Sequence, residues 1–126
     1  MRKRYICWLA AIVLVAGCSK SGPDLAPVSG RVTLDGQPVE NADVTFQPEG
    51  SKSPSFGRTD KDGNYTLGYK KGVVGALVGK HAVQISTSPE IVKGPNRFPA
   101  KYNTNSELHR DVESGKNEIN FDLTSK

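Results

Sequence analysis

The chain has 126 residues, enough for one domain with a single hydrophobic core. Its formal net charge is +4, but three of its 17 basic residues are Arg2, Lys3 and Arg4, in front of an apolar run. Removing these three from the 17 leaves 14 basic against 13 acidic side chains, a balance of +1. The remaining charge therefore gives no support for nucleic-acid binding.

Residues 1–17 have the organisation of a secretory signal peptide: a basic start, the apolar run Tyr5 to Ala16, and small residues before a polar break. The run is too short to cross a bilayer, which needs about 20 apolar residues. The alternative is a buried N-terminal helix, but the run has no polar face, so such a helix would need covering on all sides. We therefore expect this segment to be cleaved.

The end of that segment, Val15-Ala16-Gly17-Cys18, resembles the bacterial lipobox. The resemblance implies cleavage between Gly17 and Cys18, a thioether-linked lipid on Cys18, and acylation of the new amino terminus, for example with palmitate. Several acyl chains together give stable membrane anchoring. Because Ser19 rather than Asp follows, the resemblance favours the periplasmic leaflet of the outer membrane over the inner membrane. Cys7 would be lost with the signal, which leaves no thiol for a disulfide or a metal.

Residues 18–26 are predicted to be a lipidated flexible tether, because Ser, Lys, Gly and Pro bury little surface. In residues 27–126, apolar and polar positions alternate as in strands. The predicted strands are 28–34, 42–48, 56–59, 64–68, 82–86, 108–112 and 119–123. Turn signals such as Asp35-Gly36 separate them. We therefore expect an all-β domain of about seven strands, a two-sheet sandwich of transthyretin-like or immunoglobulin-like type in preference to a small open barrel.

Two segments fit this pattern poorly. "KKGVVGALVGKH" carries three glycines, too many for a helix and badly placed for a strand. "SPEIVKGPNRFPAKYNTNSE" carries three prolines and is predicted to be a long loop. Long loops are uncommon in compact domains and are often functional, so we expect any site to lie in this second segment.

The first half of the domain, "VSGRVTLDGQPVENADVTFQPEG…GRTDKDGNYTL", resembles a carboxypeptidase regulatory-like domain, which has a transthyretin-like sandwich fold. The matching positions are Gly30, Val32, Gly36, Pro38, Val39, Ala42, Val44, Thr59, Asp60, Gly63 and Tyr65. The second half is similar to small lipoproteins of bacterial cell envelopes. The resemblance implies a fold and a location, and these residues have scaffold roles: Gly63, for example, supplies a positive φ in a turn.

The sequence predicts no catalytic, metal or cofactor site. Asp60, Asp62 and Asn64 have the spacing of half a calcium loop, but the glycine and glutamate that an EF-hand requires are missing, so a turn is favoured. His81 is expected to cap the core and His109 to face solvent rather than to form a zinc site. No nucleophile elbow or phosphate-binding loop occurs. The chain also lacks the Tyr-Arg-Gly-Ser ending of transthyretin-like hydrolases.

Binding therefore remains as the expected function. The proline-rich loop concentrates rings, amides and charges, which could hold a glycan by stacking and hydrogen bonding. The candidate residues are Arg97, Phe98, Lys101, Tyr102, Asn103 and Asn105. Alternatively, the loop packs its rings over the sandwich edge and protects it, which we favour. We expect a non-catalytic lipoprotein that serves as a binding or accessory module of the cell envelope, with an envelope protein as partner; carbohydrate binding by Phe98 to Asn105 is the alternative.

Overall fold

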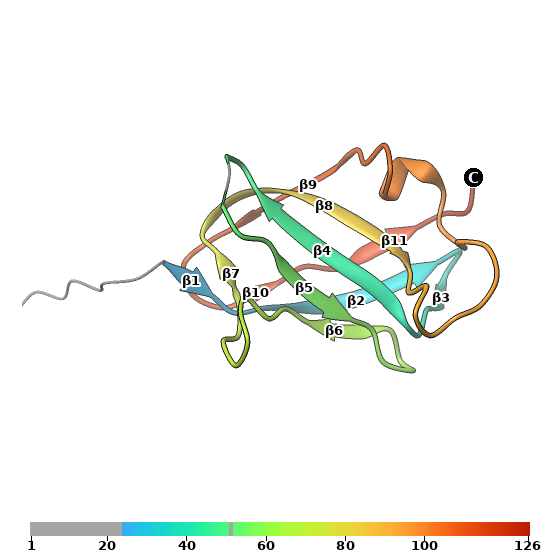
Figure 1. The fold of residues 1–126 in the computed structure, drawn as a ribbon, viewed down its shortest axis with the longest axis horizontal. Coiled ribbons are helices and arrows are strands. Elements are labelled where there is room, and N and C mark those ends of the chain that lie inside the picture. Colours follow the sequence, from blue (N-terminus) through green and yellow to red (C-terminus); the bar gives the residue numbers. More distant parts are fainter. Residues whose placement is uncertain (1–23, 51) are drawn as a thin grey trace, which may run out of the picture.

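The computed structural model describes residues 24–50 and 52–126. The predicted signal segment, the predicted cleavage and lipidation site at Gly17 and Cys18, and most of the predicted tether lie outside these residues. Within the described part, the chain forms short and medium strands and one 3₁₀ turn, η1 (Ala100–Tyr102) (Figure 1). The predicted all-β class is confirmed.

Seven of the strands correspond to the seven predicted ones, and the others have only two residues each. In chain order they are β1 (Leu25–Ala26), β2 (Val28–Leu34), β3 (Gln37–Pro38), β4 (Ala42–Pro48), β5 (Ser55–Arg58), β6 (Asn64–Thr66), β7 (Ala76–Leu77), β8 (Gly79–Thr87), β9 (Leu108–Val112), β10 (Asn117–Glu118) and β11 (Phe121–Leu123).

The strands form two facing sheets and one small pair. The first sheet is built around β2, which pairs antiparallel with β6 and β3 on one side and parallel with β10 and β11 on the other. The second sheet has the order β5-β4-β8-β9 and is antiparallel throughout. β1 pairs with β7 at one end of the sandwich. Figure 1 shows the long strands β4 and β8 lying across β2.

The core lies between the two sheets and follows the predicted alternation. Val32 of β2 and Val44 of β4 are fully buried, and the rings of Phe46 and Phe121 meet edge to face with centroids 6.1 Å apart. The guanidinium of Arg110 lies 4.7 Å from the centroid of the Phe121 ring, at the open side of β9. Burial of these apolar side chains supplies the main driving force for folding.

Two segments are more ordered than the sequence suggests. Leu25 and Ala26, predicted as the end of the tether, form β1, and Ala26 is 2% exposed; the ordered domain therefore begins two residues before the predicted boundary. The glycine-rich segment contains β7 and the start of β8. Its glycines make this possible: at Gly75, where φ is +116°, an added Cβ would lie 2.6 Å from the carbonyl oxygen of Ala26. A larger residue could not let β1 approach so closely.

The predicted turns are present. Asp35 and Gly36 both have positive φ, 54° and 84°, as a two-residue hairpin of type I′ requires. In the second turn, the Asp60 carboxylate accepts hydrogen bonds from the backbone N–H groups of Asp62 and Asn64, at 2.9 and 3.0 Å. This Asx-type turn is the arrangement favoured over a calcium loop, and Gly63 adopts its predicted positive φ of 80°.

Candidate functional site

The aromatic rings of the predicted ligand loop are buried. Phe98 is 3% exposed and Tyr102 is 9% exposed, and both belong to the hydrophobic core. The Tyr102 hydroxyl accepts a hydrogen bond from the backbone N–H of Thr124, at 3.2 Å. A ring that packs in the core cannot stack on a sugar that arrives from solvent. Phe98 and Tyr102 therefore have the structural role that was the favoured interpretation of this loop.

The loop also takes the place of a strand beside β8. β9 pairs with β8 only as far as Val83, and beyond that point side chains of the loop bond to the β8 backbone. The Asn103 amide donates to the carbonyl of Ile85 at 3.0 Å, and the Asn96 side chain accepts from the N–H of Thr87 at 3.0 Å. Asn96 was not singled out in the sequence. These bonds protect an edge that could otherwise pair with another chain.

The remaining predicted ligand residues do not converge on one point. Arg97 and Asn105 are exposed, and the Lys101 ammonium donates to the carbonyl of Lys126 at 3.1 Å while lying 5.3 Å from the Tyr102 ring centroid. The backbone of Asn105 is tied to that of Ala100. The six residues therefore do not form one cluster: the rings of Phe98 and Tyr102 lie in the core, and Arg97 and Asn105 are exposed.

A different surface combines an exposed ring with fixed charges. Among the aromatic side chains that the structure describes, Phe56 is the most exposed, at 55%. Phe56 lies opposite Thr45 in the pairing of β5 with β4. Two residues further along β5, Arg58 lies opposite Asp43. Asp43 in turn lies opposite Ser86 in the pairing of β4 with β8. We call these five outward-facing residues (Asp43, Thr45, Phe56, Arg58 and Ser86) the Phe56 face.

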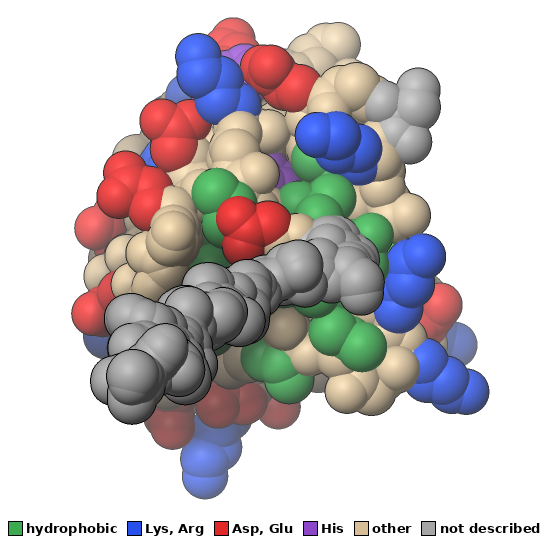
Figure 2. Space-filling model, turned by 90° about the vertical axis from the view of Figure 1, so that its left-hand side faces the viewer, with side chains coloured by type: hydrophobic (Ala, Val, Ile, Leu, Met, Phe, Trp, Pro, Cys, Tyr) green, Lys and Arg blue, Asp and Glu red, His purple; other side chains and the backbone are tan. Residues whose placement is uncertain are grey.

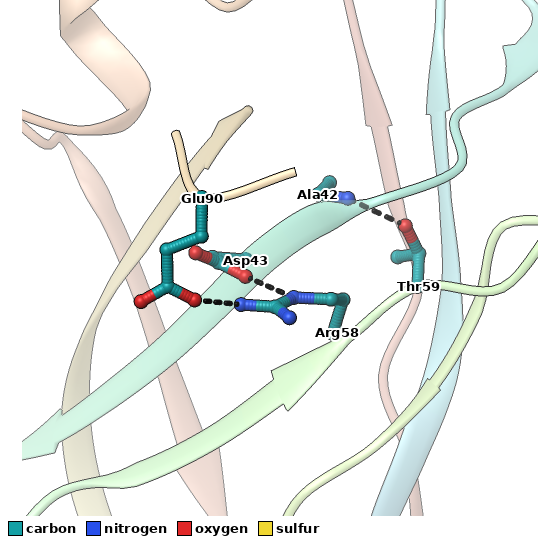
Figure 3. A network of polar contacts seen from close by, with 5 residues as sticks. All are labelled: Ala42, Asp43, Arg58, Thr59 and Glu90. Carbon is teal, nitrogen blue, oxygen red and sulfur yellow. Dashed lines mark hydrogen bonds and ion pairs between the residues drawn. The ribbon is translucent and has the colours of Figure 1, made fainter. Parts of the chain in front are cut away.

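The charged side chains of the Phe56 face are held in place. The Nε of Arg58 donates to the Asp43 carboxylate at 2.8 Å, and its Nη2 donates to Glu90, in the loop after β8, at 3.2 Å (Figure 3). The hydrogen bonds with Asp43 and then with Glu90 raise the pKa of Arg58 above its ordinary value. An exposed ion pair of this kind contributes only about 0–1 kcal/mol to stability. Its main effect is to fix the position of the guanidinium on the Phe56 face.

Buried hydrogen bonds fix β4 and β5, the two strands that carry most of the Phe56 face. The Thr59 hydroxyl accepts from the Ala42 N–H at 2.8 Å (Figure 3). The Thr59 N–H in turn donates to the Ala42 carbonyl at 3.0 Å. This clamp holds the end of β5 against the start of β4, so that Asp43 and Arg58 lie opposite each other. On the other edge of β5, Phe56 exchanges two backbone hydrogen bonds with Gly68, at 3.0 and 2.8 Å. The Phe56 side chain is thus exposed on a firmly bonded strand.

The Phe56 face encloses a shallow concavity of about 480 Å³. It offers an apolar ring, a carboxylate, two hydroxyls and a guanidinium that has five N–H donors, of which Asp43 and Glu90 engage two. Such a surface can bind a partner through ring contact and bidentate hydrogen bonding. The sequence contained a signal for it: Phe56 and Arg58 are two residues apart in a strand, so they share a face, and a charged residue marks that face as the outer one.

The two histidines lie where the sequence predicted, His81 in the core and His109 on the surface. His81 is 1% exposed and packs against Phe46 with ring centroids 5.5 Å apart; its Nε2 bonds to the carbonyl of Leu77 at 2.7 Å. His109 is exposed. Within residues 24–50 and 52–126, no three His, Cys, Asp or Glu side chains gather as a metal site would require.

Helices long and apolar enough to cross a bilayer do not occur in the described part of the chain.

Comparison with known proteins supports the fold. No protein-family profile and no curated protein matches the chain. Among solved structures, the chain is similar to a DUF3823 family protein from Parabacteroides merdae, with a TM-score of 0.51 and 15% sequence identity. The similarity covers 80% of this chain but 46% of that protein, so the chain spans less than half of its length. At this identity the likeness shows a shared β-rich fold and nothing about function.

Proposed function

We propose that this chain is a lipid-anchored, non-catalytic binding module of the cell envelope. The support comes from sequence: a signal-like segment, the lipobox-like stretch that ends at Cys18, and a short tether that leads to the domain. The resemblance to carboxypeptidase regulatory-like domains supports the same proposal. We assign the protein to the periplasmic leaflet of the outer membrane in preference to the inner membrane, because Ser19 follows the cysteine.

The binding surface in this proposal is the Phe56 face, and the observation that carries it is the exposure of Phe56. A phenylalanine that is 55% exposed on a strand bonded along both edges has no role in the core. Aromatic and arginine side chains that lie together are typical of the residues that dominate protein–protein binding energy. An envelope protein is therefore the proposed partner, and Phe56 and Arg58 are the proposed contact residues.

A carbohydrate partner is the second candidate, now at this face instead of at the loop. The specific observation in its favour is the exposed Phe56 ring beside hydroxyl, carboxylate and guanidinium groups. A sugar can place its apolar side on a ring while its hydroxyls bond to polar neighbours. Thr45 and Ser86 would supply the hydroxyl contacts and Arg58 the charged donor.

The test is photo-crosslinking in cells that produce the full-length protein with p-benzoylphenylalanine in place of Phe56. The matched control carries the same amino acid in place of Thr66, an exposed residue of β6 on the other sheet. We expect one recurrent protein to be captured from position 56 and not from position 66. Equal capture from both positions would show that the Phe56 face is not the binding surface.

Glycan binding separates the two candidates. If position 56 captures no protein, binding of the protein to envelope polysaccharide is compared between wild type and Phe56→Ala. Loss of binding in the variant supports the carbohydrate candidate. If the wild type binds no polysaccharide and captures no protein, both versions of the proposed function are wrong.

A further inference from the structure

One end of the sandwich carries apolar side chains that no other part of the described chain covers. Val73 and Val74, in the loop between β6 and β7, are 42% and 61% exposed. Leu25 and Leu77 lie opposite each other in the β1–β7 pair and are only partly buried, while their neighbours Ala26 and Ala76 face the core. We call this surface the Val74 end: Leu25, Val73, Val74 and Leu77, together with Lys70 and Lys71.

The loop that presents the two valines is a closed, hydrogen-bonded turn. The N–H of Val73 donates to the Lys70 carbonyl at 2.7 Å, and the N–H of Tyr69 donates to the Val73 carbonyl at 2.8 Å. Gly72 supplies the positive φ, 77°, that the turn needs. Val74 forms a β-bridge with Gly68. The valines are therefore held out from the body of the protein by their backbone and are not exposed through a lack of structure.

Figure 2 views the end of the molecule that carries β1. Hydrophobic side chains gather on it and basic side chains flank them on the right of the view, while acidic side chains lie mostly at the upper left, with one near the centre beside the hydrophobic side chains. Figure 1 places the loop before β7 at the same end as β1, where the chain enters the described part at Asp24. The opposite end carries the Asp35-Gly36 turn, the turn at Asp60–Asn64 and the C-terminus.

If Cys18 is lipidated as proposed above, the short stretch of chain between Cys18 and Asp24 limits how far this end can lie from the bilayer. Asp24 lies six positions after Cys18 in the chain. Even a fully extended chain of six residues spans only about 20 Å. A lipid on Cys18 would therefore keep the β1 end, with its exposed valines, within about 20 Å of the bilayer.

We propose that the Val74 end docks on the bilayer surface, with Val73 and Val74 inserted at the level of the headgroups and Lys70 and Lys71 on anionic lipid. Apolar side chains flanked by lysines are the composition of surfaces that bind membranes interfacially. Each lysine close to an anionic membrane surface strengthens binding about fivefold. Docking would fix the orientation of the sandwich on the membrane instead of leaving it on a free tether. This inference rests on the proposed anchoring.

The test uses the full chain, purified from membranes and reconstituted in vesicles that contain phosphatidylglycerol. Trp8 is the one tryptophan of the sequence and lies in the segment that the proposed cleavage before Cys18 removes, so the processed protein carries no tryptophan other than an introduced probe. Val74→Trp places the probe on the proposed docking surface. The matched control, Lys61→Trp, places it on an exposed residue of the turn at the opposite end. Lipids brominated in the acyl chains quench a tryptophan that is inserted in the bilayer.

We expect bromolipid to quench at least half of the emission of the Val74→Trp protein and almost none of that of the Lys61→Trp protein. Lys70→Glu with Lys71→Glu should weaken the quenching in phosphatidylglycerol vesicles but not in vesicles of phosphatidylcholine alone. Weak and equal quenching at positions 74 and 61, in protein that floats with the vesicles, would overturn docking while leaving the anchor intact. A blue shift at position 74 that depends on protein concentration and not on bromolipid would assign the surface to a second copy, and the proposal would be wrong. Protein that does not float lacks the anchor, and docking fails with it.

Discussion

Replacement of Gly30 by alanine tests the packing that joins β2 to the final strands. Gly30 lies opposite Tyr65 in the pairing of β2 with β6, and the Tyr65 hydroxyl donates to the carbonyl of Ile119 at 2.6 Å. A Cβ on Gly30 would lie 1.8 Å from that carbonyl oxygen and 3.0 Å from the Tyr65 ring. Real Cβ atoms essentially never approach closer than 3.0 Å, so the Ile119 peptide would have to move by about 1.2 Å.

The expected cost follows from these contacts. Overpacking of this kind costs about 1–3 kcal/mol, and loss of the tyrosine hydrogen bond adds about 0.5–1.5 kcal/mol. We therefore expect Gly30→Ala to lower the free energy of unfolding by about 2–4 kcal/mol. For a domain of this size, that corresponds to a fall in Tm of roughly 10–25 °C. Thermal unfolding followed by circular dichroism measures it.

Gly68→Ala is the matched control. Gly68 also lacks a positive φ, but an added Cβ would meet nothing closer than 3.7 Å, so it should be tolerated. If Gly30→Ala melts within about 3 °C of the wild type, or no lower than Gly68→Ala, the argument that Gly30 exists to admit the Ile119 carbonyl is wrong.

Three further predictions concern the scaffold. Thr59→Val keeps the shape of the side chain but leaves the buried Ala42 N–H without its partner, and should cost about 1–3 kcal/mol in urea unfolding; an unchanged midpoint would contradict the clamp. Tyr102→Ala should lower the free energy of unfolding by about 3–5 kcal/mol in the same assay, because the ring is buried. A change below about 1 kcal/mol would show that the ring is not packed in the core. Hydrogen bonds from Ser125 lower the pKa of Asp35, so the contact between them is present at neutral pH and is lost as the pH falls below about 3.9. The Ser125 amide resonance should follow this titration, and a midpoint at or above 3.9 would contradict it.

Local pattern predicted the strands well, because alternation depends only on which side chains are apolar. Val28, Val32 and Leu34 face the core, as do Ala42, Val44 and Phe46, and the Asp35-Gly36 turn follows from residues that accept positive φ. Which strands pair with each other could not be predicted in the same way. The parallel pairing of β11 with β2 joins residues about 90 positions apart, and no local signal specifies it.

The binding surface was harder to predict than the fold. Aromatic residues in a proline-rich loop suggested a ligand site, but Phe98 and Tyr102 fill the core, where burial removes their apolar surface from water. Phe56 was counted only as a strand residue. Phe56 shares the outer face with Arg58 because the two residues are two positions apart in β5. The opposite face is fixed inward by Ser55, which is buried and donates a hydrogen bond to the carbonyl of Gly75 at 2.9 Å, and this contact with a distant segment cannot be predicted from the strand alone.

The anchor at Cys18 is the claim on which the proposed function depends, and intact mass spectrometry of the protein extracted from membranes tests it most directly. The account predicts a chain that begins at Cys18 and carries the added mass of a diacylglyceryl group and an amide-linked acyl chain, and a Cys18→Ala protein that lacks this mass and is no longer retained in the membrane fraction. A wild-type chain that keeps residues 1–17 and carries no lipid, or a Cys18→Ala protein that stays in the membrane as before, would contradict it.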